Sequence, residues 1–355
     1  MQPLPEPPRS VCLLRLSAIG DTCHAVPILR TLQKAWPQTQ FTWIIGKTEA
    51  RLMSLIEGVE LIIVDKRAGL AARRETRRLL RQRHFDVLLH MQLAFRASLI
   101  ARATPATVKL GFDRARAREL QWFFTNRRIP ARAREHVVDS FFGFAEALGV
   151  RDRVVSWDIP LPPDALEYAA KLIPDERPTL VISPCSSHAL RNWRAERYAA
   201  VADYAARQHG MRVILCGGPT ALERDVGAAI EAAAQTPLIN QIGRDTLPQM
   251  LALLERATLL VAPDSGPAHM ATMVRTPVVG LYAATNPARS GPYLSRPWCV
   301  NAYPEAARRF CGRPPERLPW TEKIEKRGVM DLITVEQVTA KLDQALQYAQ
   351  RLGSA

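Results

Sequence analysis

Short apolar runs that alternate with helix-length amphipathic segments constrain the fold of this 355-residue chain more than any other feature. Such runs are typical of strands buried on both faces of a parallel sheet, with the intervening helices covering those faces. A first series predicts strands at 11–14, 41–45, 60–64, 87–91 and 109–112. A second series predicts strands at 179–183, 212–216, 239–242, 259–262 and 278–282. We therefore expect two doubly wound α/β domains.

Five prolines within residues 157–178 mark the connection between the two series. The expected domains are residues 1–165 and residues 166–333, followed by a C-terminal helix within 334–355. A chain of this length allows each domain to bury its own core. Residues 297–330 are rich in Pro and Arg and are expected to be irregular.

The first strand leads into a short polar turn, residues 17–22, and then into a helix with apolar residues at helical spacing up to Trp36. Pro27 is expected in the first turn of this helix, where its missing N–H costs little. Gly20 allows a ligand to approach the backbone, and Asp21 is expected to point into the crevice at the carboxyl end of the strand. The alternative is that Asp21 only caps the helix.

The net charge of +14 is concentrated in the first predicted domain. Residues 1–165 hold 26 of the 48 Lys and Arg residues but only 16 of the 34 Asp and Glu residues. Two Arg-rich segments, 66–83 and 114–134, account for this excess, and an aromatic triplet at 122–124 interrupts the second. The first segment is either an Arg-coated surface helix or a basic arm over an anionic ligand. The charge indicates an anionic partner (nucleic acid, membrane or phosphorylated acceptor) or simply an Arg-rich surface.

In the second series, three loops follow predicted strands and should therefore converge on one crevice. They are Pro184–His188 with Arg191 just beyond, Asp264-Ser265-Gly266, and Thr285-Asn286-Pro287. Hydroxyls, backbone N–H groups at a helix start and one Arg suit a pyrophosphate. The alternative is that Asp264 is a helix cap and His269 a packed histidine.

Several classes of protein are not indicated. The chain has neither G-x-G-x-x-G nor G-x-x-x-x-G-K-[ST], and no His, Cys and Asp residues stand at the spacing of metal ligands. The six cysteines form no C-x-x-C pair, which predicts buried, reduced thiols in a cytosolic protein. No apolar run approaches the roughly 18 residues of a membrane span, and residues 1–10 do not read as a signal peptide.

Two motifs in this order resemble glycosyltransferase family 9, the heptosyltransferases of the lipopolysaccharide inner core. They are LLRLSAIGDTCHAVPILRTLQ at 13–33 and PDSGPAHMATMVRTPVVGLYAATNPARSGPY at 263–293, and the resemblance extends over the chain after residue 10. It implies the GT-B fold, in which two Rossmann-like domains face one another. The first domain would bind the acceptor and the second the nucleotide-sugar, and the C-terminal helix would pack back on the first domain.

The resemblance also implies an activity: inverting transfer of heptose from ADP-L-glycero-D-manno-heptose to Kdo-lipid A or heptosyl-Kdo-lipid A. It implies no metal and no other cofactor, and action at the cytoplasmic face of the inner membrane as a peripheral, monomeric protein. Asp21 would be the general base and Arg15 a cation beside the reacting centre. The residues assigned to donor binding are Ser186, Ser187, Arg191, Glu223, Asp264, Ser265, Gly266, His269 and Thr285. The residues assigned to acceptor binding are Ser17, Gly20, Arg73, Arg74, Arg77, Arg114, Arg116, Arg118 and His136.

Two alternatives remain at this point. The chain could be a member of the same family that uses another nucleotide-sugar or another acceptor. A basic nucleic-acid-binding protein is the second alternative, which the lack of a recognised binding module disfavours. Aromatic residues accompany the arginines only at 122–124.

Overall fold

The computed structural model describes residues 4–65 and 69–353, and the chain forms two compact units. The first unit ends at Pro160 and the second begins at Leu161, five residues before the predicted boundary. Helix α6 (Pro163–Leu172) explains this difference, because Ala165 and Ala169 pack against Ala252 of the second unit.

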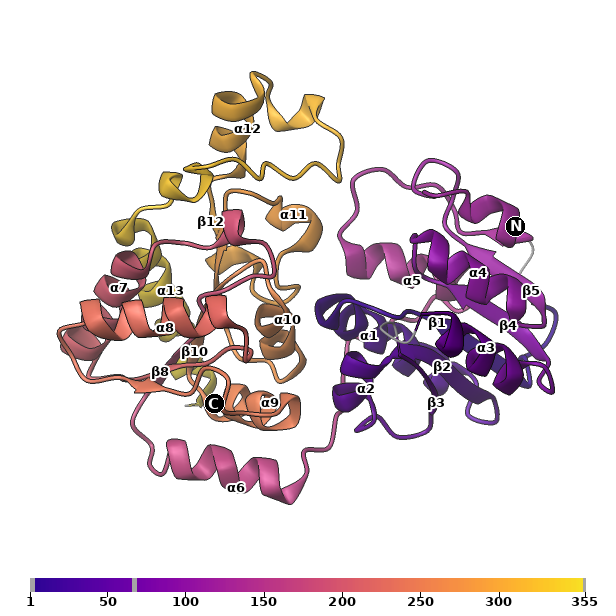
Figure 1. Ribbon diagram of the computed structural model, residues 1–355, viewed down its shortest axis with the longest axis horizontal. Helices are drawn as coiled ribbons and strands as arrows, with labels where there is room; N and C mark the ends of the chain where they lie inside the picture. Colours follow the sequence, from indigo (N-terminus) through magenta and orange to yellow (C-terminus); the bar gives the residue numbers. More distant parts are fainter. Residues whose placement is uncertain (1–3, 66–68, 354–355) are drawn as a thin grey trace. The chain divides into compact units, whose positions relative to one another are not determined.

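The first unit contains a six-stranded parallel sheet with the strand order β3-β2-β1-β4-β5-β6. The strands are β1 (Ser10–Leu14), β2 (Gln40–Gly46), β3 (Glu60–Val64), β4 (Phe85–His90), β5 (Ala106–Gly111) and β6 (Arg127–Arg128). The helices are α1 (Ile19–Ala35), α2 (Lys47–Met53), α3 (Gly69–Leu80), α4 (Phe95–Ala103), the 3-10 turn η1 (Gln121–Phe124) and α5 (Val137–Ala147), seen in Figure 1. The five predicted strands are confirmed, and the two-residue strand β6 is an addition.

The second unit repeats this topology in the order β12-β11-β10-β7-β8-β9. Its strands are β7 (Thr179–Ile182), β8 (Arg212–Leu215), β9 (Ile239–Asn240), β10 (Leu259–Pro263), β11 (Val278–Tyr282) and β12 (Val300–Asn301). The main helices are α7 (Ala195–His209), α8 (Ala221–Ala233), α9 (Leu247–Arg256), α10 (Gly266–Met273), α12 (Tyr303–Cys311) and α13 (Val335–Gly353). In both units the chain order reverses beside the first strand, which is the arrangement of doubly wound nucleotide-binding domains.

Helix α1 begins at Ile19, so Pro27 lies in its interior and not in its first turn as predicted. Proline has no N–H to donate to the carbonyl four residues earlier, which is that of Cys23. The indole Nε1–H of buried Trp157 donates to this carbonyl instead, at 2.8 Å. Trp157, three residues before the end of the first unit, therefore supplies the hydrogen bond that the Cys23 carbonyl cannot receive from Pro27.

One prediction for the C-terminal region is wrong. Residues 297–330 are not irregular throughout, because α12 buries Tyr303, Ala306 and Ala307. The packing of the last helix on the first domain stays a prediction. Helix α13 lies against α7 and β11 of the second unit, and its buried face consists of Val338, Leu342, Ala345 and Leu346.

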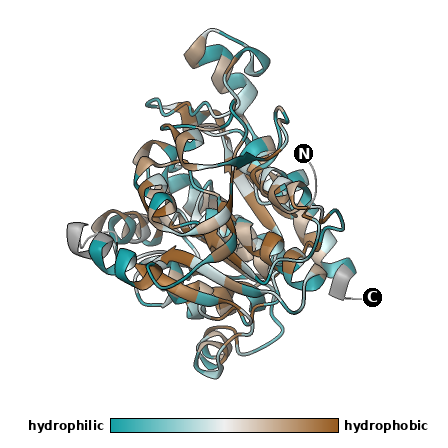
Figure 2. Cartoon of the chain, turned by 90° about the vertical axis from the view of Figure 1, so that its right-hand side faces the viewer, coloured by the Kyte–Doolittle hydropathy of each residue, from teal (hydrophilic) through white to brown (hydrophobic). Residues whose placement is uncertain are grey.

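Apolar residues, brown in Figure 2, predominate in the strands, whereas the helices combine brown with hydrophilic residues in teal. All six cysteines are unpaired, and five of them are buried. Burial raises the pKa of Cys185 to about 12, so this thiol stays protonated at neutral pH. Within the described residues, no helix combines the length and apolar character needed to cross a bilayer.

Candidate functional site

Most of the predicted site residues follow strands that flank the two points where the strand order reverses. In the first unit this point lies between β1 and β4, and in the second between β7 and β10. Ligands of doubly wound domains bind outside the carboxyl ends of such strands. Arg15 and Asp21 follow β1, while Arg191 and Asp264 follow β7 and β10 respectively.

In the first unit, Arg15 and Asp21 form an ion pair between Nη2 and Oδ2. Asp21 Oδ2 also accepts a hydrogen bond from the backbone N–H of Ala18 at 3.3 Å, so this carboxylate caps α1 as well. The capping role, one of the two alternatives for Asp21, is observed, and its catalytic role stays a prediction. Both contacts use Oδ2, so Oδ1 of this side chain, 36% exposed, remains available to accept a proton.

Arg15 is held from three sides and is only 12% exposed. Its Nη1 donates to the carbonyl of Met91 at 2.5 Å, and its guanidinium lies 5.5 Å from the ring centroid of Phe141. Arg15 Nε is buried and has no hydrogen-bond partner among the described residues. The cation is therefore fixed beside Asp21 with one donor unused.

Sequence reasoning missed the residues that shape the loop around this pair. Gln92 accepts from the backbone N–H of Leu16 at 2.6 Å and donates to Ser17 Oγ at 3.3 Å. Gln121 donates to the carbonyls of His90 and Gln92 at 2.9 and 3.1 Å. Burial, together with the charges of Arg15 and Lys109, lowers the pKa of His90 to about 3, so His90 is neutral at pH 7.

In the second unit, Arg191 is the centre of a charged cluster. Its Nε and Nη2 donate to Glu325 Oε1 at 2.9 and 2.5 Å, while Nη1 lies 4.0 Å from Asp264 Oδ2. Burial favours a higher pKa for Asp264, but hydrogen bonds from His269 and Thr285 and the charge of Arg191 outweigh it and lower this pKa. Glu325 lies in the segment predicted to be irregular and was not predicted as a site residue.

Polar atoms without partners accumulate in the same loops. His188 Nδ1, Asn192 Nδ2 and Ser265 Oγ are buried and make no hydrogen bond to any described residue. Ser265 is the N-cap of α10, where backbone N–H groups are unsatisfied and the helix dipole is positive. Buried polar groups normally have partners, so these atoms indicate a polar, anionic ligand.

The remaining predicted donor residues surround this cluster or support its loops. Ser186 is buried and donates through its backbone N–H to Asn192 Oδ1 at 2.7 Å, whereas Ser187 is exposed. His269 Nε2 lies 3.7 Å from Asp264 Oδ1, and Gly266 begins α10. Glu223 accepts from the backbone N–H of Gly218 at 2.9 Å, so it holds the turn after β8.

The predicted acceptor residues fall into exposed and engaged groups. Arg74, Arg77, Arg114 and Arg118 are exposed. Arg116 is engaged by Asp113, Glu135, Ser140 Oγ and the carbonyl of Pro130. Ser17 bonds Gln92, Gly20 is buried at the start of α1, and His136 Nδ1 accepts from Val138 N at the start of α5.

The first Arg-rich segment forms a surface helix, α3, where it is described. Arg73 belongs to α3, but its side chain lies outside the described residues, as do residues 66–68. Residues 69–80 therefore form the surface helix and not the basic arm, which was the other alternative.

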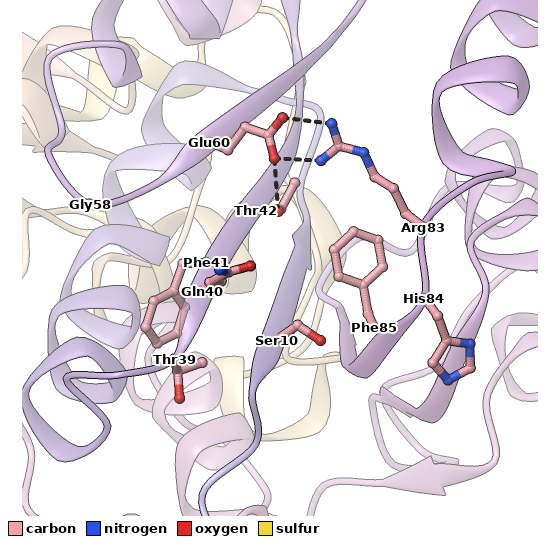
Figure 3. A pocket seen from close by; sticks show the side chains of 10 residues that line it. All are labelled: Ser10, Thr39, Gln40, Phe41, Thr42, Gly58, Glu60, Arg83, His84 and Phe85. Carbon is pink, nitrogen blue, oxygen red and sulfur yellow. Dashed lines mark hydrogen bonds and ion pairs between the residues drawn. The ribbon is translucent and has the colours of Figure 1, made fainter.

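A pocket of about 510 Å³ in the first unit lies at the opposite, amino-terminal edge of the sheet, among the first residues of β1 to β4. Figure 3 shows that its charged groups face one another: Arg83 pairs with Glu60, which also accepts from Thr42. The charges of Arg83 and Glu60 therefore neutralise one another within the pocket. Among the described residues, no three His, Cys, Asp or Glu side chains are grouped as metal ligands would be.

Comparisons with known proteins bear on the family and the fold of the chain. The profile of glycosyltransferase family 9 (heptosyltransferase) matches residues 73–311. The chain is 42% identical over 337 residues to the lipopolysaccharide core heptosyltransferase OpsX of Haemophilus influenzae, covering 95% of this chain and 97% of that protein.

Two solved structures have the same fold. The family 9 glycosyltransferase from Veillonella parvula superposes with a TM-score of 0.78 at 23% identity, covering 96% of this chain and 97% of that one. The Escherichia coli heptosyltransferase WaaC, solved with ADP, superposes with a TM-score of 0.73 at 20% identity, covering 95% and 99%. The GT-B fold expected from the two motifs is confirmed.

Proposed function

Because the chain belongs to glycosyltransferase family 9, the heptosyltransferase family, we propose that it transfers heptose from ADP-L-glycero-D-manno-heptose to the Kdo-bearing inner core of lipopolysaccharide. The chain is a glycosyltransferase, a heptosyltransferase of lipopolysaccharide core biosynthesis. The identity of the donor, the identity of the acceptor and the inversion at the anomeric carbon are the parts that we propose.

One observation carries the donor assignment: the unpartnered polar atoms beside Arg191 at the start of α10. His188 Nδ1, Asn192 Nδ2 and Ser265 Oγ need hydrogen-bond partners, and a diphosphate supplies many acceptor oxygens. Arg191 Nη1 is directed towards these loops, since Nε and Nη2 are occupied by Glu325. The helix start and the guanidinium would then stabilise the ADP that leaves.

In the proposed reaction, the acceptor hydroxyl oxygen attacks the anomeric carbon of the heptose. Asp21 Oδ1 takes the hydroxyl proton, because both fixed contacts of this carboxylate use Oδ2. The bond from the anomeric carbon to the diphosphate oxygen breaks on the opposite face, and ADP departs with the bonding electrons. Arg15 keeps the carboxylate in place through its ion pair.

The proposed acceptor is a lipid, so we place the reaction at the cytoplasmic face of the inner membrane. The exposed arginines of the first unit, Arg74, Arg77, Arg114 and Arg118, are suited to phosphates and carboxylates of Kdo and lipid A. The stabilisation of the leaving group is assigned to Arg191 and α10, and the proposal includes no metal or other cofactor.

A donor panel tests the function. The purified protein is incubated with Kdo-lipid A and one donor at a time: ADP-heptose, ADP-glucose or UDP-glucose. The mass of each product is then measured by mass spectrometry. We expect a mass gain of one heptose with ADP-heptose and a kcat/KM roughly a hundredfold lower with the other donors. Preference for a UDP-sugar would favour the alternative, a family member with a different donor. Lipopolysaccharide from a deletion strain would then identify the linkage.

Glu325 is expected to position Arg191 for the donor. Its carboxylate binds two nitrogens of the guanidinium and leaves Nη1 facing Asp264. Replacing Glu325 by Ala should raise the donor KM about tenfold, because the freed guanidinium loses its fixed orientation, and should change kcat less. Glu325→Gln, which keeps a hydrogen-bond acceptor, should recover part of the loss.

The matched control for Glu325 is Lys323→Ala, an exposed position in the same segment. Steady-state kinetics with varied concentrations of ADP-heptose separate the effect on the donor KM from the effect on kcat. A lower donor KM in Glu325→Ala would mean that the carboxylate competes with the donor for Arg191 and would contradict the positioning role.

A further inference from the structure

Large apolar side chains are exposed on the first unit where η1 packs on α4. Phe123 is 74% exposed, Leu120 47% and Phe95 44%. The ring of Phe95 contacts that of Phe124 at 6.0 Å, and the ring of Phe123 contacts that of Trp122 at 5.7 Å. The two ring pairs are neighbours, because Phe123 and Phe124 are consecutive and line the same pocket, and Phe95, Leu120 and Phe123 remain exposed within the described part of this unit.

The backbone holds this surface in place. Glu119 and Leu120 both have positive φ, 47° and 61°, which is uncommon for residues other than glycine. The carboxylate of Glu119 accepts from the backbone N–H of Phe95, which ties the turn to the start of α4. The conformation of the turn therefore keeps Leu120 exposed.

The surroundings of this surface are strongly basic. Residues 91–134 contain ten Lys and Arg residues and two acidic ones. Both acidic side chains are engaged, Glu119 with the backbone N–H of Phe95 and Asp113 with Arg116. Arg96 and Arg102 of α4 are exposed, and Arg102 lines a pocket with Phe123 and Phe124.

A pocket of about 420 Å³ opens within this region. It is lined by Arg102, Lys109, Phe123, Phe124, Thr125 and Asn126. Lys109 Nζ donates to the carbonyl of Ala101 at 2.8 Å, which fixes the ammonium at the pocket wall. Two cations beside two aromatic rings suit a phosphate that carries an apolar chain.

We propose that this aromatic-basic patch (Phe95, Arg96, Arg102, Lys109, Leu120, Phe123 and Phe124) binds the surface of an anionic phospholipid bilayer. Aromatic and aliphatic side chains would enter the interface, while Arg102 and Lys109 would hold lipid phosphates. The inference rests on the proposed action on a membrane lipid and names the surface that brings the protein there. The rings pack against one another in pairs, edge to face for Phe95 and Phe124 and tilted for Trp122 and Phe123. They do not form the row of open ring faces on which successive bases stack, which disfavours single-stranded nucleic acid as the partner.

Vesicle binding of the full chain tests the proposal without donor or acceptor. Co-sedimentation is measured with phosphatidylcholine vesicles that contain or lack phosphatidylglycerol, at low and high salt. We expect binding only to vesicles with phosphatidylglycerol, weakened by salt. Phe123→Ser should lower the partition coefficient about tenfold, and the double variant Arg96→Gln, Arg102→Gln by a similar factor.

Leu222→Ser is the matched control, because Leu222 is 44% exposed on α8 of the second unit. It should bind vesicles as the unaltered protein does. The proposal is overturned if the unaltered protein does not bind phosphatidylglycerol vesicles or if Phe123→Ser and Leu222→Ser behave alike. It is also overturned if a single-stranded oligonucleotide, and not the vesicle, loses affinity in the patch variants.

Transfer assays separate this inference from the proposed function. With an acceptor stripped of its acyl chains, Phe123→Ser should work at the unaltered rate, whereas with acceptor embedded in vesicles its rate should fall several-fold. If the unaltered protein transfers no heptose yet binds vesicles through Phe123, the docking surface stands and the proposed function fails. If it transfers heptose to both acceptors and the variant does so equally, the docking surface fails alone.

Discussion

Asp21→Asn should lower the kcat for heptose transfer about a thousandfold, within the range attributed to general bases. The amide cannot take the proton of the attacking hydroxyl, whereas its carbonyl oxygen can still accept from the backbone N–H of Ala18. The cap of α1 is therefore kept, and we expect a nearly unchanged melting temperature. Affinity for ADP should also be unchanged, because the groups assigned to the donor lie in the second unit.

The measurement combines ADP release in the presence of acceptor with calorimetric binding of ADP. Asp152→Asn, an exposed carboxylate in the same unit, is the matched control and should retain full activity. Asp21→Ala additionally removes the cap, which costs about 1 kcal/mol, whereas both variants remove the negative charge that pairs with Arg15. If Asp21→Asn turned over at the rate of the unaltered protein, another group would have to be the base.

The architecture of both units follows from local sequence patterns. Strands buried on both faces leave continuous apolar runs, and parallel strands need helical crossovers, so ten of the twelve strands and their order of appearance were predictable, including the two-residue β9. The short edge strands β6 and β12 were not, because two residues such as Arg127 and Arg128 carry no apolar pattern. Their pairing depends on the sheet that is already formed beside them.

Helix α12 shows where composition misleads. The segment around it is rich in Pro and Arg, which suggests irregular structure, yet Pro304 lies in the first turn of the helix and Gly312 ends it with a φ of 64°. Both residues are typical of those places. Arg308 and Arg309 occupy the exposed side, so the buried side could have been found from the spacing of Tyr303, Ala306 and Ala307.

Residues of the candidate site that follow a strand closely in the sequence were predictable. Residues that a distant segment contributes to the site were not. Asp21, Arg191 and Asp264 lie near strand ends in the sequence itself, so topology places them. Glu325 comes from a segment 134 residues beyond Arg191 and meets it only because the chain folds back, with the Ile324 N–H bonded to the Ala284 carbonyl at 2.7 Å. No local pattern contains that contact. The ion pair of Arg15 and Asp21 joins residues only six apart across a turn.

Arg191→Met should lower kcat/KM for ADP-heptose by about two to three orders of magnitude, comparable with the loss of one preorganised donor to a developing anion. The diphosphate gains negative charge as the sugar leaves, and Arg191 is the cation of its cluster, next to Asp264 and Glu325. Arg191→Lys keeps the charge but cannot bind Glu325 through two nitrogens and face the donor with a third, so it should recover only part of the rate.

The controls for Arg191 distinguish a donor contact from a folding defect. Arg194→Lys, three residues along the chain, alters an exposed arginine that pairs with Asp331 and should leave the kinetics unchanged. Arg191→Met should weaken ADP binding together with kcat, whereas Asp21→Asn should lower kcat and leave ADP binding intact. The two variants should differ in ADP affinity because the proposed base lies in the first unit and the proposed diphosphate site in the second. Full ADP affinity in Arg191→Met, at an unchanged melting temperature, would remove Arg191 from the diphosphate site and leave the unpartnered atoms of that loop without an assigned ligand.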